Sequence, residues 1–167
     1  ELQEKIGEGG FGKVYLANHK NTGQKVAIKF LVVNHQYDQN KRQRYIERFN
    51  RETTLCSQLS HPNIVHLYDK VQCGEDLLFA VFEYIDGISL KQKLLDQGSL
   101  DVTSATEIML QILDGLAHAH SKGIIHRDIK PANIMLSFSH TRPIVKILDF
   151  GIGTLEYQAR QADYKSL

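Results

Sequence analysis

The chain has 167 residues, of which 42% are hydrophobic and 23% charged, and its formal net charge is +1. This length fits one domain, or two small lobes that share a cleft. The near balance of charge excludes a strong field that would select nucleic acid or an anionic membrane.

The cysteines and the apolar runs indicate the compartment. Cys56 and Cys73 have no metal-ligand spacing and cannot build a disulfide framework, so we expect a reducing environment and no zinc. No signal-peptide pattern opens the chain, and its longest apolar run, residues 77–81, is only strand-sized. We expect a cytoplasmic protein or the cytoplasmic part of a longer one, and the sequence does not indicate an oligomeric state.

The first third of the chain predicts strands and then a helix. Residues 13–18 and 25–33 are β-rich runs separated by a turn at residues 21–23, and residues 40–59 form the expected helix. One apolar stripe follows this helix at three- and four-residue steps: Tyr45, Phe49, Cys56 and Leu59. Glu52 falls on the same stripe, and a carboxylate that faces a core requires a cationic partner.

The same helix carries a local excess of basic residues, Lys41, Arg42, Arg44 and Arg48. This group is either a solvated helix face or a docking patch for an acidic partner.

The rest of the chain changes from strands to helices. Two strands, residues 64–71 and 77–84, precede a break at Asp86 and Gly87. After the break we expect a short helix capped by Ser89 and ending at Gly98. A longer helix follows over residues 103–122, with Ser104 and Glu107 as its capping box, Gly123 at its end and an inner face of Ile108, Ile112, Leu116 and Ala119.

Short strands over residues 134–136 and 144–148 complete the pattern. Strands first and helices second indicate an α+β protein. We expect a strand-rich lobe over residues 1–85 and a helical lobe over residues 86–167.

The first motif with a chemical meaning is a glycine-rich segment near the start. It reads Gly7, Glu8, Gly9, Gly10, Phe11, Gly12, Lys13, Val14. Glycines at these positions let backbone amides approach phosphate oxygens. A dinucleotide-binding loop would open a helix and a P-loop would end in Gly-Lys-Ser/Thr, whereas here residues 14–17 continue as a strand.

The second motif is Lys29, which directly follows the apolar residues 26–28 in an otherwise apolar strand. It is either an edge lysine whose ammonium reaches water, or an ammonium that holds phosphate oxygens and pairs with Glu52. Pairing would explain both charges at once.

The third motif is the run from His126 to Asn133. In this run Asp128 would orient an attacking hydroxyl and accept its proton, Lys130 would neutralise a moving phosphoryl group, and Asn133 offers a carbonyl oxygen to a hard cation. The alternative is a polar loop after a helix, which would not need so many different residues in fixed order. A fourth motif, Asp149, Phe150 and Gly151, follows an apolar strand, and there Asp149 would hold Mg²⁺.

At these residues the chain resembles the eukaryotic-type protein kinase family, and the four motifs occur in the family's order. Lys130, two places after Asp128, resembles the serine/threonine branch, and the run Ile129 to Asn133 resembles its bacterial members. The resemblance implies a two-lobe fold, ATP and Mg²⁺ as cofactors, and transfer of the ATP γ-phosphate to Ser or Thr hydroxyls of a protein substrate.

The resemblance also implies roles at the nucleotide. The adenine would lie between Ile6, Val14, Ala27 and Met135. Phe82 would be the gatekeeper, the backbone of Glu83 and Ile85 would bind the adenine edge, and Ser89 would lie near the ribose. Cys56 would stack with His126 and Phe150, and Arg127 resembles the arginine that binds an activation-loop phosphate in many relatives. For the apolar residues, a plain core role is the alternative.

The sequence departs from the family after Gly151, because no Ala-Pro-Glu motif follows before Leu167. We therefore expect a fragment of a longer protein, which alone would bind ATP weakly and phosphorylate little. The competing hypothesis is a non-catalytic module, a pseudokinase or a nucleotide-sensing scaffold, although Lys29, Glu52, Asp128, Asn133 and Asp149 are all present.

Overall fold

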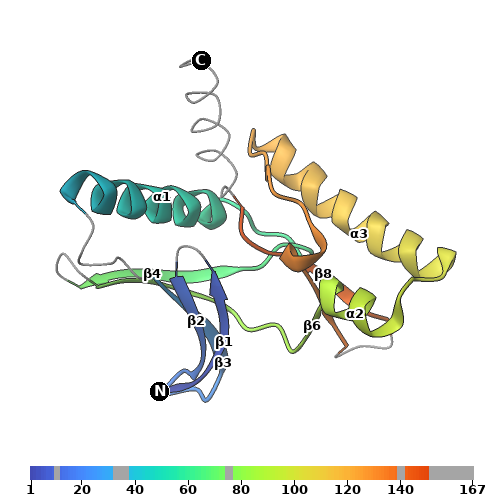
Figure 1. Ribbon diagram of the computed structural model, residues 1–167, viewed down its shortest axis with the longest axis horizontal. Coiled ribbons are helices and arrows are strands. Elements are labelled where there is room, and N and C mark those ends of the chain that lie inside the picture. The colour runs from blue at the N-terminus through green and yellow to red at the C-terminus, as the bar shows by residue number, and fades with distance from the viewer. Residues whose placement is uncertain (10–11, 32–37, 74–76, 139–141, 151–167) are drawn as a thin grey trace. The chain divides into compact units, whose positions relative to one another are not determined.

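The computed structural model describes residues 1–9, 12–31, 38–73, 77–138 and 142–150, and the chain forms two compact units (Figure 1). The first unit holds Glu1–Gln58 and Val65–Tyr84, and the second holds Leu59–Ile64 and the chain from Ile85 onward. The short segment Leu59–Ile64 thus belongs with residues that come more than twenty positions later, which its sequence gives no reason to expect.

The first unit is built on an antiparallel sheet with the strand order β1-β2-β3-β5-β4. Its strands are β1 (Leu2–Gly9), β2 (Gly12–Asn18), β3 (Lys25–Leu31), β4 (Leu67–Cys73) and β5 (Leu77–Glu83). The expected strand over residues 64–71 starts too early, because Ile64 forms a parallel bridge with Ile147 in the second unit. Residues 32 and 33, expected at the end of β3, lie outside the described residues.

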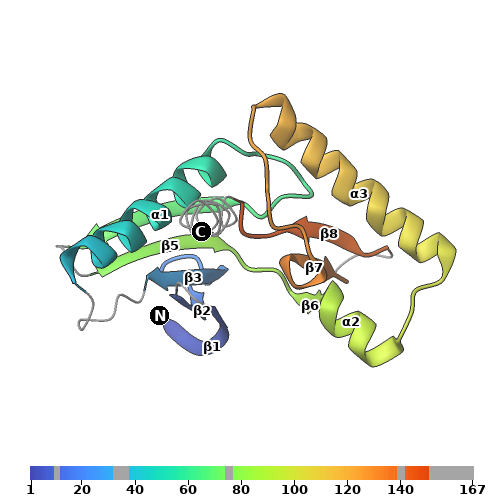
Figure 2. The same cartoon turned by 45° about the horizontal axis from the view of Figure 1, so that its top comes forward.

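The helix α1 (Gln39–Ser57) packs against this sheet (Figure 2). Asp38 caps it, since the Asp38 Oδ1 atom accepts a hydrogen bond from the Lys41 N–H at 2.8 Å. The buried core under the helix consists of Leu31, Phe49, Leu78 and Ala80, with Tyr45, Ile46, Leu67 and Phe82 packed around it. The helix expected from the sequence ends two residues too late, since Leu59 lies beyond the C-cap Gln58, although Leu59 is buried.

Among its described residues, the second unit contains a small sheet with the strand order β6-β7-β8 and two α-helices. Its elements are β6 (Gly87–Ser89), α2 (Leu90–Gln97), α3 (Val102–Ser121), a 3₁₀ turn (Pro131–Asn133), β7 (Ile134–Ser137) and β8 (Ile144–Ile147). The limits predicted for α2 are confirmed, since the Ser89 hydroxyl accepts from the Gln92 N–H and Gly98 ends the helix with a φ of 78°.

Helix α3 begins earlier than its sequence suggested. Its N-cap is Asp101, whose carboxylate accepts from both the backbone N–H and the hydroxyl of Ser104, at 2.9 and 2.6 Å. These bonds lower the pKa of Asp101. The capping box assigned to Ser104 and Glu107 is therefore wrong, because a carboxylate three residues before Ser104 already serves as acceptor, and Glu107 instead pairs with Arg142 at 3.7 Å.

The buried face of α3 consists of Ile108, Ile112, Gly115 and Ala119, so Gly115 replaces the expected Leu116. It packs over β8, and a Cβ atom on Gly115 would come within 2.9 Å of the Ile147 Cδ1 atom and 3.3 Å of Asn63. Absence of a side chain thus permits the close approach of helix and strand.

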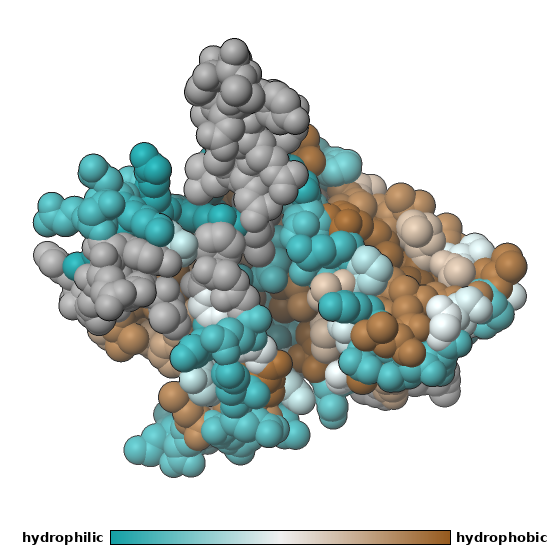
Figure 3. Space-filling model, in the orientation of Figure 1, coloured by the Kyte–Doolittle hydropathy of each residue, from teal (hydrophilic) through white to brown (hydrophobic). Residues whose placement is uncertain are grey.

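The opposite face of α3 exposes Met109, Leu110 and Leu113, and the hydrophobic surface over this helix is visible in Figure 3. Even so, within the described part of the chain no helix has both the length and the apolar character needed to cross a bilayer.

Candidate active site

The glycine-rich segment forms the connection between two antiparallel strands. Gly7 lies opposite Val14, Glu8 opposite Lys13, and Gly9 opposite Gly12. The expected pairing of the strands on either side of the loop is therefore confirmed, while Gly10 and Phe11 lie outside the described residues. A Cβ atom on Gly12 would lie 2.0 Å from the Phe30 carbonyl oxygen, so only glycine fits there.

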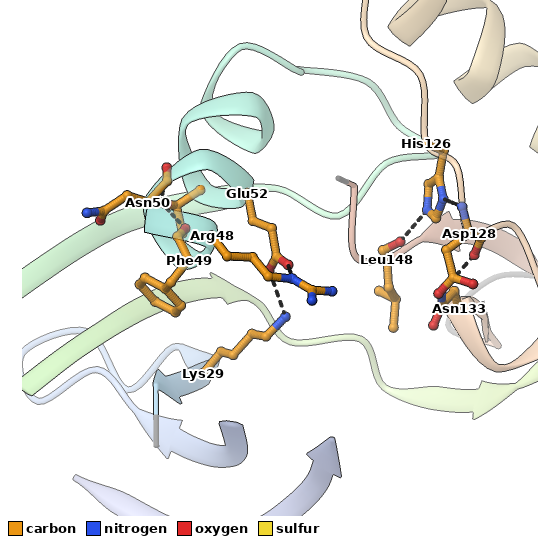
Figure 4. A network of polar contacts seen from close by, with 10 residues as sticks. Lys29, Arg48, Phe49, Asn50, Glu52, His126, Asp128, Asn133 and Leu148 are labelled. Atoms are coloured by element: carbon orange, nitrogen blue, oxygen red, sulfur yellow. Dashed lines mark hydrogen bonds and ion pairs between the residues drawn. The ribbon is translucent and has the colours of Figure 1, made fainter. Parts of the chain in front are cut away.

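Lys29 and Glu52 form the ion pair that the sequence predicted (Figure 4). The Lys29 Nζ atom lies 3.4 Å from the Glu52 Oε2 atom, and the side chains are 15% and 9% exposed. Glu52 has a second cation, because the Arg48 Nε atom lies 3.4 Å from its Oε1 atom. This second pair was not expected from the sequence, although residues four apart on a helix are neighbours and the spacing of Arg48 and Glu52 indicates it.

The residues assigned to the adenine are distributed over both units. In the first, Val14 lies opposite Lys29 and Ala27 opposite Phe82. The Glu83 N–H donates to the His66 carbonyl at 2.9 Å. Of the two backbone groups of Glu83, the carbonyl oxygen is therefore the one that would bind an adenine edge. The remaining residues of this set are the half-exposed Ile6 in β1, and Ile85, Ser89 and Met135 in the second unit.

In the second unit, Ser89 lies opposite Met135 in the β6–β7 pairing. The β3–β5 and β6–β7 registers thus bring two parts of the expected set together, each within its own unit.

Asp128 is the centre of a polar cluster in the second unit (Figure 4). The Asn133 Nδ2 group donates to the Asp128 carbonyl oxygen and to its Oδ2 atom, both at 2.9 Å. The Lys130 Nζ atom lies 2.7 Å from the same Oδ2 atom. Because the Asn133 amide donates with its nitrogen, its Oδ1 atom is the one that can bind a cation.

The donor set suits a hard cation. An amide oxygen from Asn133 and a carboxylate from Asp149 are the ligands that Mg²⁺ prefers, and Mg²⁺ usually completes its shell with water and phosphate oxygens. The described residues contain no group of three or more His, Cys, Asp or Glu side chains that could hold a metal by themselves.

His126 connects this cluster to the residues after β8. Its side chain is buried, its Nδ1 atom accepts from the Asp128 N–H at 3.2 Å, and its Nε2 atom lies 2.7 Å from the Leu148 carbonyl oxygen. These contacts require the neutral ring protonated on Nε2. Burial lowers the pKa of His126 below its ordinary value of 6.5, which agrees with a neutral ring.

Phe150 packs edge-on against the same imidazole, with the ring centroids 4.6 Å apart. The contact expected between His126 and Phe150 is thus present. Cys56 belongs to the other unit, so its stacking with them stays a prediction, and Gly151 lies outside the described residues.

Two non-glycine residues next to His126 and Leu148 have left-handed backbone conformations. Arg127 has a φ of 66° and Asp149 a φ of 56°. Such conformations are uncommon for residues other than glycine and concentrate at functional sites. Each comes directly after one partner of the His126–Leu148 hydrogen bond, so that bond helps to hold both strained residues.

The sequence is similar to those of known proteins, and these similarities identify its family. The family model for the protein kinase domain matches residues 1–166. The chain is 41% identical over 149 residues to "Serine/threonine-protein kinase PrkC" of Bacillus subtilis, covering 89% of this chain and 22% of that protein. It is 38% identical over 155 residues to "Probable serine/threonine-protein kinase pknA2" of Bifidobacterium longum, covering 92% and 20%.

A third relative, "Serine/threonine-protein kinase pkn3" of Myxococcus xanthus, is 38% identical over 151 residues, covering 90% of this chain and 27% of that protein. The chain thus spans about a quarter or less of the length of these relatives. The α+β class expected from the sequence is confirmed, and the chain belongs to the protein kinase domain family.

Proposed function

We propose that this chain carries the ATP-binding and catalytic residues of a serine/threonine protein kinase, which transfers the γ-phosphoryl group of ATP to a Ser or Thr hydroxyl of a protein. The observation that carries the proposal is the arrangement at Asp128, whose carboxylate is bound by Asn133 and Lys130 from the same short loop. Relatives named serine/threonine-protein kinases at 38–41% identity support it.

In this function Asp128 orients the substrate hydroxyl and takes its proton. The hydroxyl oxygen bonds to the γ-phosphorus while the bond from that phosphorus to the β–γ bridging oxygen breaks, and ADP leaves. Lys130, whose ammonium already lies at the Asp128 carboxylate, can bind the oxygens of the moving phosphoryl group. The side chain of Asp128 is 28% exposed, so a substrate hydroxyl can reach it.

The first unit supplies the phosphate-binding residues of the proposal. Lys29 binds α- and β-phosphate oxygens, and Glu52 holds its ammonium in place. The glycine-rich connection of β1 and β2 covers the phosphates with backbone amides. The adenine set proposed to surround the base and ribose is Ile6, Val14, Ala27, Glu83, Ile85, Ser89 and Met135.

Asn133 and Asp149 are the proposed magnesium ligands. Bound Mg²⁺ would neutralise charge on the β- and γ-phosphates. The contribution of the chain is orientation: Asp128 fixes the Asn133 amide, and the Leu148 carbonyl bond to His126 fixes the residue before Asp149. We further propose a protein substrate, no nucleic-acid partner and a cytoplasmic location.

The test is phosphoryl transfer by the intact protein, with Mg²⁺, radiolabelled ATP and a generic basic protein as acceptor. Asp128→Asn should lower kcat by about 100-fold or more, the size of a general-base contribution, while nucleotide binding is kept. Asp96→Asn is the matched control, since Asp96 lies on the exposed face of α2 and has no assigned role.

A rate unchanged in Asp128→Asn would refute the base assignment. Intact wild-type protein that binds ATP with Mg²⁺ but transfers no phosphate would instead identify the non-catalytic scaffold. Lys29→Met should also remove activity, and transfer without any divalent cation would contradict the roles given to Asn133 and Asp149.

A further inference from the structure

The outer edge of β8 is closed by two side chains at Val145 and by the backbone of Asn63 at Ile147. One edge of β8 pairs with β7. On the other edge, the Val145 N–H donates to the Gln111 Oε1 atom at 2.9 Å, and the Val145 carbonyl accepts from the Asn63 Nδ2 group at 3.0 Å. Two residues on, the Ile147 N–H donates to the Asn63 carbonyl at 2.8 Å. The peptide groups that a lone strand edge would leave exposed are therefore satisfied.

At this edge Gln111 links helix α3 to Asn63 and to the segment that holds Pro143 and Val145. Its Oε1 atom accepts from both the Val145 N–H and the Asn63 Nδ2 group, at 2.9 and 3.0 Å, and its Nε2 group donates to the Pro143 carbonyl at 3.0 Å. Both polar ends of one neutral side chain are thus engaged. Its amide orientation is fixed, because only the nitrogen can donate to a carbonyl.

The packing of α3 places Gln111 within reach of β8. Gly115, one turn further along the same face, has no side chain to hold the helix away from Ile147 and Asn63. Gln111 is half-buried, while Asn63 is buried at 6% exposure. Lost hydrogen bonds at such a site leave desolvated groups, which costs more than the loss of an exposed bond.

The residues directly after β8 connect this edge to the proposed metal ligands. The Leu148 N–H donates to the Asn133 carbonyl at 2.9 Å, and the Leu148 carbonyl accepts from His126 at 2.7 Å. Asp149, with its left-handed backbone, comes next. The position of β8 along its own axis therefore determines where the Asp149 backbone lies relative to Asn133.

From these contacts we infer that Gln111, together with Asn63, is a positioning residue for Asp149: it fixes β8 and through it the geometry of the magnesium site. This inference rests on the proposed function. Gln111 acts only through β8 and has no assigned contact with substrate. Partners that orient metal ligands in this indirect way typically change metal affinity or activity by about 10- to 100-fold when they are removed.

The decisive variant is Gln111→Leu in the intact protein. It keeps the size of the side chain and removes its hydrogen bonds to Asn63, Val145 and Pro143. We expect kcat to fall about 10-fold or more and the Mg²⁺ concentration for half-maximal rate to rise by a similar factor, with KM for ATP at saturating Mg²⁺ changed less than about 3-fold.

Gln92→Leu is the matched control. Gln92 is also a helical glutamine with a side-chain hydrogen bond, to the Asp96 Oδ1 atom at 2.7 Å, but it is exposed on α2. This variant should have the Mg²⁺ dependence of the wild type.

If Gln111→Leu does not fold, Gln111→Glu is the second variant that tests the positioning role. A carboxylate can still accept from Asn63 and Val145, but it faces the Pro143 carbonyl without a proton to donate. Its rate relative to the wild type should therefore rise as the pH falls from about 8 to 6 and the carboxyl group takes up a proton. A purely structural role would give lower thermal stability with no such pH dependence.

The outcomes separate the inference from the proposed function. If the wild type transfers phosphate but the folded Gln111 variants keep its kcat and Mg²⁺ dependence, the positioning role is wrong. Should the wild type itself show no Mg²⁺-dependent transfer, the proposed function fails and this inference falls with it.

Discussion

Replacing His126 tests how the catalytic segment is held together. His126→Phe keeps a ring next to Phe150 but removes both hydrogen bonds, leaving the Asp128 N–H and the Leu148 carbonyl without their partner. A buried polar group that loses its partner costs about 1–3 kcal/mol. The two together give about 2–6 kcal/mol. His126→Ala removes in addition an aromatic contact of about 1 kcal/mol and opens a cavity, so it should cost more.

The assay is hydrogen exchange of the intact protein, read by mass spectrometry on peptides that cover residues 124–136 and 142–149. Exchange of these amides reports the free energy of local opening. His126→Phe should accelerate their exchange by about 30- to 20,000-fold, which corresponds to about 2–6 kcal/mol, whereas peptides from β1 and β2 should change little. Equal exchange in the variant and the wild type would refute the idea that His126 holds Asp128 and Leu148.

The same histidine makes local stability depend on pH. Its pKa is lowered in the folded protein relative to the ordinary value of 6.5, so the contribution of the neutral ring is fully present above that value. As the pH falls below 6.5, the unfolded state takes up the proton first and stability decreases, by at most about 1.4 kcal/mol per pH unit, until the folded pKa is passed. His126→Phe should lose this component between about pH 7.5 and 5.5. A pH dependence identical to that of the wild type would contradict it.

Two further predictions concern ion pairing and capping. Glu52→Leu removes the carboxylate that Lys29 and Arg48 contact in a mostly buried place, so we expect the free energy of unfolding, measured by heat or urea, to fall by about 3 kcal/mol. The loss should be smaller when Arg48→Met is combined with it. An unchanged midpoint would show that the two contacts do not stabilise the fold. Asp101→Ala should lower the midpoint of thermal unfolding by removing the cap of α3, whereas Asp101→Asn should retain most of the stability. Equal stability of the wild type and Asp101→Ala would contradict the cap.

The sequence by itself determined the elements and the motifs. Capping residues, glycines and apolar periods act over a few residues, so α2 was predicted with its Ser89 cap and Gly98 end, and α1 with its buried Glu52. Charge alone required a cation for Glu52, and Lys29 was the right partner. Errors arose where two local signals compete, as at the start of α3, where Asp101 and not Ser104 is the cap.

Only the tertiary structure decided which distant groups meet. Asn63 and Val145 are 82 residues apart, and no period or cap signal relates them. The neutral state of His126 and the placement of Gln111 at β8 likewise depend on hydrogen bonds between residues that are 22 and 34 positions apart in the sequence. A folded chain must satisfy buried peptide groups wherever they come together. Which peptide groups are buried together is decided only when the strands and helices pack, so the order of the residues alone could not reveal their hydrogen-bond partners.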